Sequence, residues 1–167
     1  MIRNKHWSPF EMVDMCVEIV TSRAIAHQIL RHWSFSFQEF SQRYASVNEF
    51  EEIQLRYQAD KNRQSSSDVL SEKDMIEAME IVNSTINKCK EGYSRLLEIG
   101  VAKECARFIL PESTRTTLYM KGSIRDWIHY LQIRCDDHAQ LEHRQVAKEI
   151  KEIFNTNFPN ISKALMS

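Results

Sequence analysis

Apolar and polar positions alternate along one stretch near the N-terminus, and helical spacing governs most of the remaining chain. From Met12 to Val20, the apolar residues Met15, Val17 and Ile19 fall on one face, which predicts a strand. A second strand is predicted from Thr116 to Met120. The other periodic segments are longer and favour helices. The pattern therefore predicts a helix-rich α+β fold with a small mixed or antiparallel sheet.

The first predicted helix follows the first strand directly. Thr21 or Ser22 is suited to cap it, and its pattern continues to about residue 33. Gln28, Arg31 and His32 are spaced i, i+3 and i+4 on this helix. Residues with that spacing are neighbours on a helix surface, so these three are expected to share one polar face.

A long helix is predicted from Ser71 to Glu98, and Gly100 is a suitable residue to end it. Its apolar residues alternate spacings of four and three, which is typical of a coiled-coil seam. The seam consists of Met75, Met79, Val82, Ile86, Cys89, Tyr93 and Leu96. Either a second copy of the chain or other parts of the same chain can cover such a seam, and the sequence leaves both open.

The remaining segments are shorter. The polar stretch from Asn48 to Asp68 is expected to form a loop, and Phe35 to Tyr44 is expected to be extended or looped. Further helices are predicted from Ala102 to Ile109 before Pro111, after a cap at Ser123, from about Asp137 to Phe154, and after Pro159.

The composition is that of an ordinary globular protein. The chain has 167 residues, of which 43% are hydrophobic and 27% are charged, and residues 1–167 are expected to form a single domain. No stretch approaches the ~20 apolar residues of a membrane span, and the N-terminus lacks the apolar core of a secretion signal. The cysteines lie far apart in the sequence, which indicates reduced thiols in a cytoplasmic setting. A net charge of −1 gives no electrostatic argument for binding nucleic acid or a membrane, so neither partner is expected.

The run from Arg31 to Ala45 concentrates aromatic rings, arginines and hydroxyl groups in one short segment. Aromatic rings offer flat surfaces for stacking, and arginine offers a planar fork that fits phosphate. Together they favour a ligand that has both a heterocycle and an anion, such as a nucleotide.

Several other chemistries lack their usual sequence signals. The histidines do not show the short paired spacing of a zinc site, so no metal is expected. Ser41 lacks the G-x-S-x-G context of a hydrolytic nucleophile, and the run from Arg31 to Ala45 contains no cysteine. No glycine-rich phosphate loop is present, so neither a Walker nor a Rossmann site is expected.

The same run resembles the signature of the flavin-dependent thymidylate synthases, and most closely that of their viral and phage members. The signature is R-H-R, followed by a spaced S, N/Q-E, S and R-Y. The matching residues here are Arg31, His32, Ser36, Gln38, Glu39, Ser41, Arg43 and Tyr44. Trp33 stands where the family usually has arginine. Flanking blocks match in the same order at residues 6–11, 104–107, 110–111, 123–134 and 138–140.

The resemblance implies a homotetramer that methylates deoxyuridine monophosphate (dUMP) to deoxythymidine monophosphate (dTMP). Methylenetetrahydrofolate would be the carbon donor, FAD the redox cofactor and NADPH the reductant. The resemblance also implies a cytoplasmic enzyme, in the host cytoplasm if the source is viral.

The resemblance further assigns residues to two ligands. Those implied to contact dUMP are Gln28, Arg31, Glu39, Phe40, Ser41, Gln42, Arg43, Arg107 and Arg134, with Phe40 and Gln42 giving mainly backbone contacts. Those implied to contact FAD are Ser8, Glu11, Arg31, His32, Trp33, Gln38, Glu39, Ser123, Arg125, His129 and His138. Arg134 is the expected catalytic residue. A fixed cation at the N3/O2 edge of uracil favours the ionised ring, whose C5 is the more reactive carbon.

Two other interpretations remain open from the sequence. Trp33 in place of arginine fits a nucleotide- and flavin-binding homologue without synthase activity. A purely structural helical oligomer would use its arginines in ordinary salt bridges, for which Glu39, Glu104 and Asp136 are candidate partners. Family members usually carry a strand and a helix before the block at residues 6–11. Contacts from that segment are expected to have no counterpart in this chain.

Overall fold

The structure is a computed structural model, and it describes residues 2–4, 6–46, 49–61 and 65–166. Its contacts divide the chain into two compact units. Unit 1 comprises residues 1–20, 25–39 and 117–167, and unit 2 comprises residues 21–24 and 40–116. The expectation that the whole chain forms one domain stays a prediction.

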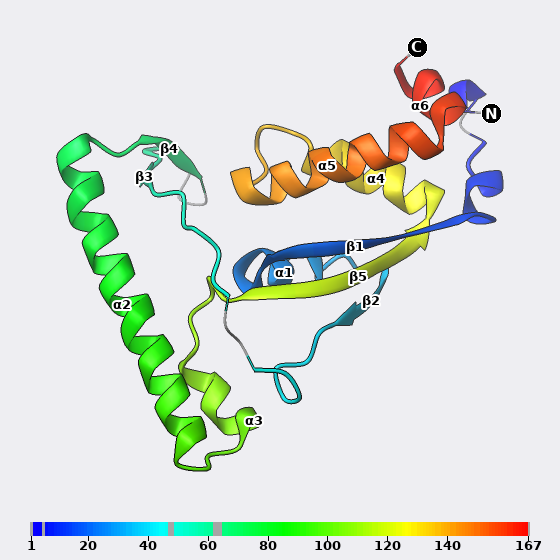
Figure 1. Ribbon diagram of the computed structural model, residues 1–167. Coiled ribbons are helices and arrows are strands. Elements are labelled where there is room, and N and C mark those ends of the chain that lie inside the picture. The colour runs from blue at the N-terminus through cyan, green and yellow to red at the C-terminus, as the bar shows by residue number, and fades with distance from the viewer. Residues whose placement is uncertain (1, 5, 47–48, 62–64, 167) are drawn as a thin grey trace. The chain divides into compact units, whose positions relative to one another are not determined.

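Unit 1 is built on a three-stranded sheet with the order β1-β5-β2 (Figure 1). The strands are β1 (Asp14–Ser22), β2 (Ser36–Glu39) and β5 (Arg115–Ser123). β2 pairs antiparallel with β5, and Phe37 lies opposite Met120. Exposed and buried residues alternate along β1, and Met15, Val17 and Ile19 enter the core. The first predicted strand is therefore confirmed, and so is the second.

Helix α4 is fixed to this sheet at its first turn. The helices of this part of the chain are α1 (Arg23–Ile29), α4 (Ile124–Arg134), α5 (Leu141–Asn157) and α6 (Pro159–Met166). The Ser123 hydroxyl accepts from the Asp126 N–H, and the Asp126 carboxylate accepts from the Ser123 N–H, which confirms the predicted cap. The indole N–H of Trp127 donates to the Met15 carbonyl oxygen at 2.9 Å. α5 packs on α4, and α6 packs on α5.

A contiguous apolar core holds unit 1 together. It combines alternate strand residues with the buried faces of α1, α4 and α5, and Trp127, Tyr130 and Phe154 are its largest fully buried side chains. Burying a large apolar side chain contributes roughly 1.5–3 kcal/mol relative to leaving it exposed. The core therefore gives firm support to polar side chains at its edge.

Helix α1 is shorter than the sequence pattern predicts. It ends at Ile29 instead of near residue 33, and the two residues expected to cap it are the last residues of β1. Beyond Ile29 the chain turns, because the His32 N–H donates to the Ile29 carbonyl oxygen. The expectation that Gln28, Arg31 and His32 share one helical face is therefore wrong. The turn brings Phe35 into the core, and this packing outweighs the helical propensity of the preceding residues.

Unit 2 contains a small hairpin where the sequence predicts a loop. Its antiparallel strands are β3 (Arg56–Gln58) and β4 (Ser66–Val69). The Tyr57 hydroxyl donates to Asp74 at 2.5 Å and accepts from the Ser71 N–H at 3.0 Å, so polar contacts hold the hairpin to the start of the next helix. The loop prediction is wrong here because such strands show no apolar alternation. Residues 48 and 62–64 of the predicted loop region lie outside the described residues.

The long helix α2 (Glu72–Glu98) is confirmed together with both predicted ends. The Ser71 hydroxyl accepts from the Asp74 N–H at 3.2 Å. Gly100 has a φ of 88°, and its N–H donates to the Leu97 carbonyl oxygen at 3.0 Å. This is the left-handed helix end that glycine permits. The predicted short helix follows as α3 (Lys103–Ala106) and a 3₁₀ helix (Arg107–Ile109), which both pack on α2.

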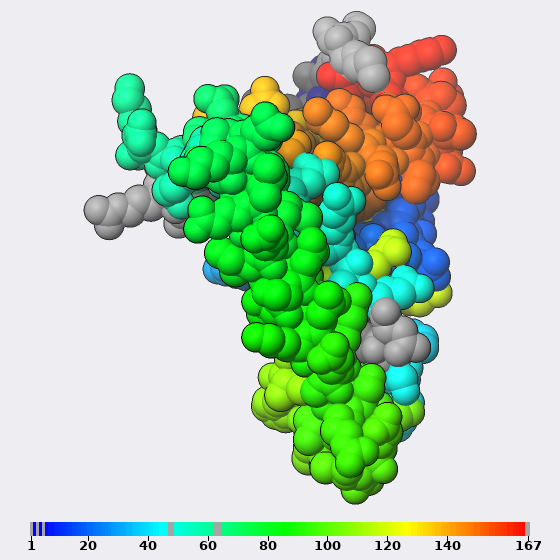
Figure 2. All heavy atoms as spheres, turned by 60° about the vertical axis from the view of Figure 1, so that its left-hand side comes forward, coloured from blue at the N-terminus to red at the C-terminus, as the bar shows by residue number. Residues whose placement is uncertain are grey.

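The apolar seam of α2 is only partly covered. Tyr93 is buried, whereas the other seam residues are half-buried. Figure 2 shows α2, in green, with side chains along much of its length on the surface. A hollow of about 310 Å³ lies beside the seam at Met79, Val82 and Ile86. Unit 2 therefore leaves apolar helix surface that its own described residues do not bury.

Candidate active site

Arg134 and His32 form the centre of the candidate site in unit 1. Arg134 lies in the last turn of α4, and its Nε–H donates to Nε2 of His32 at 2.9 Å. A histidine nitrogen accepts a hydrogen bond only when it carries no proton, so His32 is neutral with its proton on Nδ1. Within the described residues, the two Nη nitrogens of Arg134 have no protein partner. The outer fork of a fixed guanidinium is therefore free to bind an anion or the edge of a pyrimidine.

Burial and charge keep His32 neutral. Desolvation, the cation of Arg134 and the nearby His129 together lower its pKa from 6.5 to about 4. Protonation of His32 would place two cations in contact and would remove the acceptor of the Arg134 N–H. Near neutral pH the pair is therefore one fixed cation with a neutral acceptor behind it.

Three further residues of the predicted sites differ in how they are held. Gln28 in α1 donates from Nε2 to Oε1 of Gln140 at 2.5 Å, which links α1 to the residue that precedes α5. Arg31 is exposed in the turn after α1. Trp33 has 93% of its surface exposed. A ring with so little packing contributes almost nothing to the fold, and it is available for stacking on a ligand.

The predicted flavin residues all belong to unit 1. Arg125 Nη1 donates to Glu11 Oε1, which joins the start of α4 to the 3₁₀ helix at Ser8–Glu11, and both side chains stay about half exposed. His129 is exposed on α4, one turn after Arg125. The Ser123 hydroxyl is bonded within the capping box. The remaining members, apart from His138, lie in the turn after α1 and in β2: Arg31, His32, Trp33, Gln38 and Glu39.

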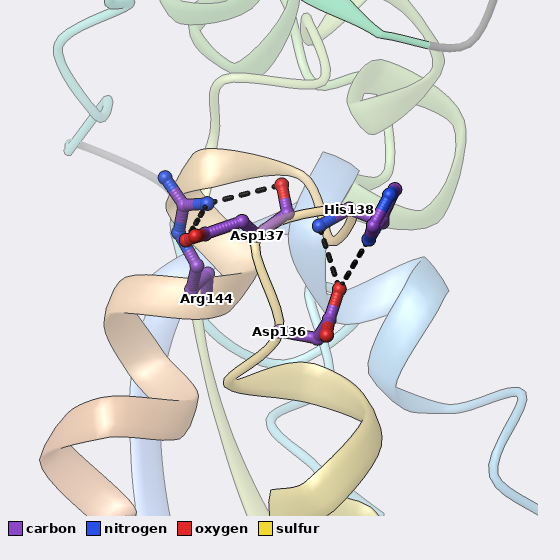
Figure 3. Close-up of polar contacts among 4 residues, drawn as sticks. All are labelled: Asp136, Asp137, His138 and Arg144. Atoms are coloured by element: carbon purple, nitrogen blue, oxygen red, sulfur yellow. Dashed lines mark hydrogen bonds and ion pairs between the residues drawn. The ribbon is translucent and has the colours of Figure 1, made fainter.

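The turn between α4 and α5 carries His138 and two aspartates (Figure 3). Asp136 Oδ1 accepts from the backbone N–H of His138 at 2.9 Å and from its Nδ1 at 2.5 Å. These two bonds hold the pKa of Asp136 below its ordinary value. Arg144 Nη1 donates to Oδ1 and to the carbonyl oxygen of Asp137, at 2.8 and 3.1 Å. The contacts of Asp136 with His138 and of Arg144 with Asp137 fix the turn, while the His138 side chain stays 94% exposed.

The remaining nucleotide residues belong to unit 2, in the loop after β2 and at the end of α3. Arg43 pairs with the Glu104 carboxylate at 3.3 Å, and Arg107 Nε donates to the Glu104 carbonyl oxygen at 3.3 Å. Ser41 accepts from the Arg43 N–H and so shapes the loop. The salt bridge between Arg43 and Glu104, which the sequence offered as a purely structural alternative, does form. Both partners are 55% exposed, and an exposed pair of this kind contributes only ~0–1 kcal/mol.

Two other residues of this loop differ in exposure. Phe40 is largely exposed, whereas Gln42 is buried and its Nε2 has no hydrogen-bond partner. A buried donor without an acceptor costs about 1–3 kcal/mol. The loop therefore carries a local energetic penalty, and penalties of this kind are typical of functional sites.

Sequence reasoning missed two residues beside Arg134. Tyr130 and His143 both adjoin the His32 ring, with ring centroids 5.0 and 6.2 Å away. The i, i+4 spacing of Tyr130 and Arg134 was the available signal. His143 had no local signal, because α5 meets α4 only through tertiary packing.

Within the described ranges, no group of three or more histidine, cysteine or acidic side chains is placed to hold a metal ion. In the same part of the chain, no helix combines the length and the apolar character needed to cross a bilayer. The cysteines at positions 16, 89, 105 and 135 are free thiols.

Comparison with protein families decides which family the chain belongs to. A family model described as thymidylate synthase complementing protein matches residues 1–160. The chain belongs to this family. The resemblance that the motifs indicated is thereby confirmed, and its ordered blocks lie within the matched residues.

Curated relatives of this family member are named as flavin-dependent thymidylate synthases. A protein of Paramecium bursaria Chlorella virus 1, named as a probable flavin-dependent thymidylate synthase, is 53% identical over 165 residues, which cover 98% of this chain and 76% of that protein. The flavin-dependent thymidylate synthase of Synechocystis is 51% identical over 164 residues, with coverages of 98% and 76%. A viral protein is thus among the relatives of this family member.

Solved structures agree with the family fold. The UMP/dUMP methylase PolB of Streptomyces cacaoi bound with 5-Br UMP matches with a TM-score of 0.85 and 28% identity, over 93% of this chain and 74% of that chain. The same enzyme bound with 5-Br dUMP matches with a TM-score of 0.81 and 27% identity, over 93% and 71%. The predicted α+β class is therefore confirmed for this thymidylate synthase family member.

Proposed function

We propose that this chain is a flavin-dependent thymidylate synthase that converts dUMP to dTMP, with methylenetetrahydrofolate as carbon donor, FAD as cofactor and NADPH as reductant. The observation that carries the proposal is the identity of 53% and 51%, over 98% of the chain, to proteins named for this activity. The motif from Arg31 to Tyr44 lies within the matched length. Because one fold can host several activities, the site must also suit the reaction.

The chain supplies a fixed positive charge for the uracil ring. His32 holds Arg134 through Nε, so the Nη fork loses little further freedom when it takes the N3/O2 edge of uracil. A cation at that edge stabilises the ring anion, whose C5 is the more reactive carbon. Arg134 is therefore the proposed catalytic residue, and Gln28, Arg31 and Glu39 are proposed to bind the nucleotide as well.

Unit 2 supplies cations for the phosphate. The pair between Arg43 and Glu104 is exposed and therefore weak. A phosphate dianion carries more negative charge than a carboxylate and can bind the guanidinium in the same bidentate way, so it can replace the carboxylate at Arg43. Arg107 is proposed to bind the same phosphate, and the loop residues Phe40, Ser41 and Gln42 to line it.

The side chains of unit 1 fit FAD by their chemistry. FAD combines aromatic ring systems with a pyrophosphate, and this unit exposes the indole of Trp33 and the cations of Arg31 and Arg125. The proposed holding residues are Ser8, Glu11, Arg31, His32, Trp33, Gln38, Glu39, Ser123, Arg125, His129 and His138. When bound, FAD supplies the redox chemistry that side chains lack.

The active species is proposed to be a homotetramer. The seam of α2 is left half-buried by its own unit, and pairing with a helix of another copy would cover it. Binding pockets also bury ~70–90% of a ligand, which is demanding for one small chain that must hold FAD, a nucleotide and a folate. Light scattering with flavin absorbance at assay concentration tests the assembly. An active, flavin-loaded monomer would contradict it.

Tritium release from dUMP labelled at C5 tests the reaction, because methylation at C5 expels the hydrogen of that carbon. The purified protein should release tritium and form dTMP only when FAD, methylenetetrahydrofolate and NADPH are all present. Bound flavin and dUMP without tritium release would indicate a homologue that lacks synthase activity. No bound flavin at all would favour the structural oligomer.

A further inference from the structure

Behind the Arg134–His32 pair lies a buried polar contact that the proposed chemistry does not use. The Tyr130 hydroxyl oxygen and Nε2 of His143 are 3.0 Å apart, and their residues are 1% and 0% exposed. Tyr130 lies on α4, one turn before Arg134, whereas His143 lies on α5. The contact therefore joins the helix that carries Arg134 to the helix beside it.

The two rings of this contact also set the orientation of His32. The His32 ring meets Tyr130 edge to face, with centroids 5.0 Å apart and planes at 77°, and it meets His143 at 6.2 Å and 84°. The ring of Phe35 also packs against His32, with centroids 6.4 Å apart and planes at 90°. The plane of an imidazole decides where its nitrogen lone pair points. These rings therefore determine the direction of the acceptor that Arg134 uses.

Stability alone does not account for a polar pair in this place. A bonded polar pair makes only a small net contribution to stability, and an apolar pair of the same shape is often as stable. Nδ1 of His143 is also buried without a hydrogen-bond partner, which adds a cost. What the pair offers, and an apolar pair does not, is a directional link between α4 and α5.

We propose that Tyr130 and His143 are positioning residues for Arg134. Their hydrogen bond fixes the rings that hold His32, and His32 in turn aims the guanidinium at the substrate. The inference rests on the proposed function, in which Arg134 contacts uracil, and neither Tyr130 nor His143 touches the substrate. A displacement of about 1 Å at a reacting group can cost on the order of 100-fold in rate, so a loosened support is visible in turnover.

Conservative variants separate this role from a general role in the core. Tyr130→Phe removes the hydroxyl and keeps the ring, and His143→Leu removes the imidazole. His143→Gln returns an amide near the position of Nε2, so it can restore the bond to the Tyr130 hydroxyl. Ile150→Val is the matched control, because Ile150 is buried on the same helix and has no part in the contact.

Turnover, dUMP binding and fold are measured for each variant. Tyr130→Phe and His143→Leu should lower kcat at saturating dUMP about tenfold, with the dUMP Kd from calorimetry changed less than about twofold. His143→Gln should recover most of kcat, and Ile150→Val should leave kcat and Kd unchanged. In nitrogen NMR of the histidine rings, Nε2 of His32 should be unprotonated and hydrogen-bonded in the wild type, and that signal should shift in Tyr130→Phe.

Two outcomes would overturn the inference: a folded Tyr130→Phe protein with wild-type kcat and an unchanged His32 signal, or an equal loss of kcat in Ile150→Val. Failure of the proposed function is distinguishable, because it appears in the wild type as absent tritium release. In that case the His32 signal of the variants still tests the positioning role.

Discussion

Unit 1 and unit 2 hold the side chains of the candidate site in opposite ways. Unit 1 has a contiguous core of strand and helix residues, whereas the buried apolar side chains of unit 2 within the described ranges are Tyr93 and Ala106. Arg134 in unit 1 is held by a half-buried imidazole, whereas Arg43 in unit 2 is held by an exposed carboxylate. The six histidines of the chain all lie in unit 1.

The difference indicates which chemistry each unit suits. A charge that must stabilise one edge of a ring has to be aimed, and aiming requires side chains locked by packing. A charge that captures a phosphate acts at longer range and tolerates movement. We therefore expect substitutions in unit 1 to change rate and stability, and substitutions in unit 2 to change mainly binding and assembly.

The largest expected contrast concerns stability. Trp127→Ala should lower the free energy of unfolding by about 3–5 kcal/mol, because it leaves a cavity in the core of unit 1. Ile86→Ala, on the half-buried seam of α2, should cost less than about 1 kcal/mol in the dissociated chain and act chiefly on assembly. Chemical denaturation measures the first, and light scattering the second. Equal losses of unfolding free energy would remove the distinction between the units.

The next contrast concerns catalysis. Arg134→Ala should lower kcat about 100-fold, which corresponds to about 3 kcal/mol of transition-state stabilisation, with a smaller change in dUMP affinity. Arg107→Ala should chiefly weaken dUMP binding, since its proposed partner is the phosphate. Steady-state kinetics and calorimetry on both proteins give the comparison. Small, equal effects of both changes on kcat and KM would contradict the two roles.

A pH effect on stability should come from unit 1. The pKa of His32 and that of His143 are both lowered to about 4, with burial as the largest cause. The unfolded chain protonates these two histidines more readily than the folded chain does. The stability that the neutral histidines contribute is therefore full above about pH 6.5 and is lost as pH falls toward 4. Between pH 7 and 5 the loss should be on the order of 2 kcal/mol, allowing for the partial exposure of His32. His143→Gln should reduce this loss, and an unchanged loss in that variant would assign the effect elsewhere.

The smallest expected effect concerns Trp33, which is exposed on unit 1 but contributes nothing to its core. Trp33→Arg should leave the melting temperature unchanged. If Trp33 stacks on the flavin, the change should lower flavin affinity by up to about tenfold. If arginine at this position is needed for full function, the change should raise flavin affinity or activity instead. Flavin titration decides the sign, and an unchanged affinity and rate would rule out both roles.

Local signals predicted most of the elements. The alternation of Met15, Val17 and Ile19 identified β1, the seam identified α2, and Ser123 and Gly100 identified helix ends. These predictions succeeded because each depends on residues a few positions apart. The end of α1 and the hairpin of β3 and β4 were not predictable in this way. Burial of Phe35 decides the first, and polar contacts of Tyr57 with the start of α2 hold the second.

The sequence by itself determined the family, because several ordered motifs match it residue by residue, and it supplied the residues of the candidate site. It did not determine how those side chains are held. Arg134 finds its acceptor at His32, 102 positions away, and not at the neighbouring Asp136. That choice depends on the turn after α1 meeting α4, and on the rings of Tyr130 and His143 behind it. Such contacts arise only when distant elements pack, so only the tertiary structure decided them.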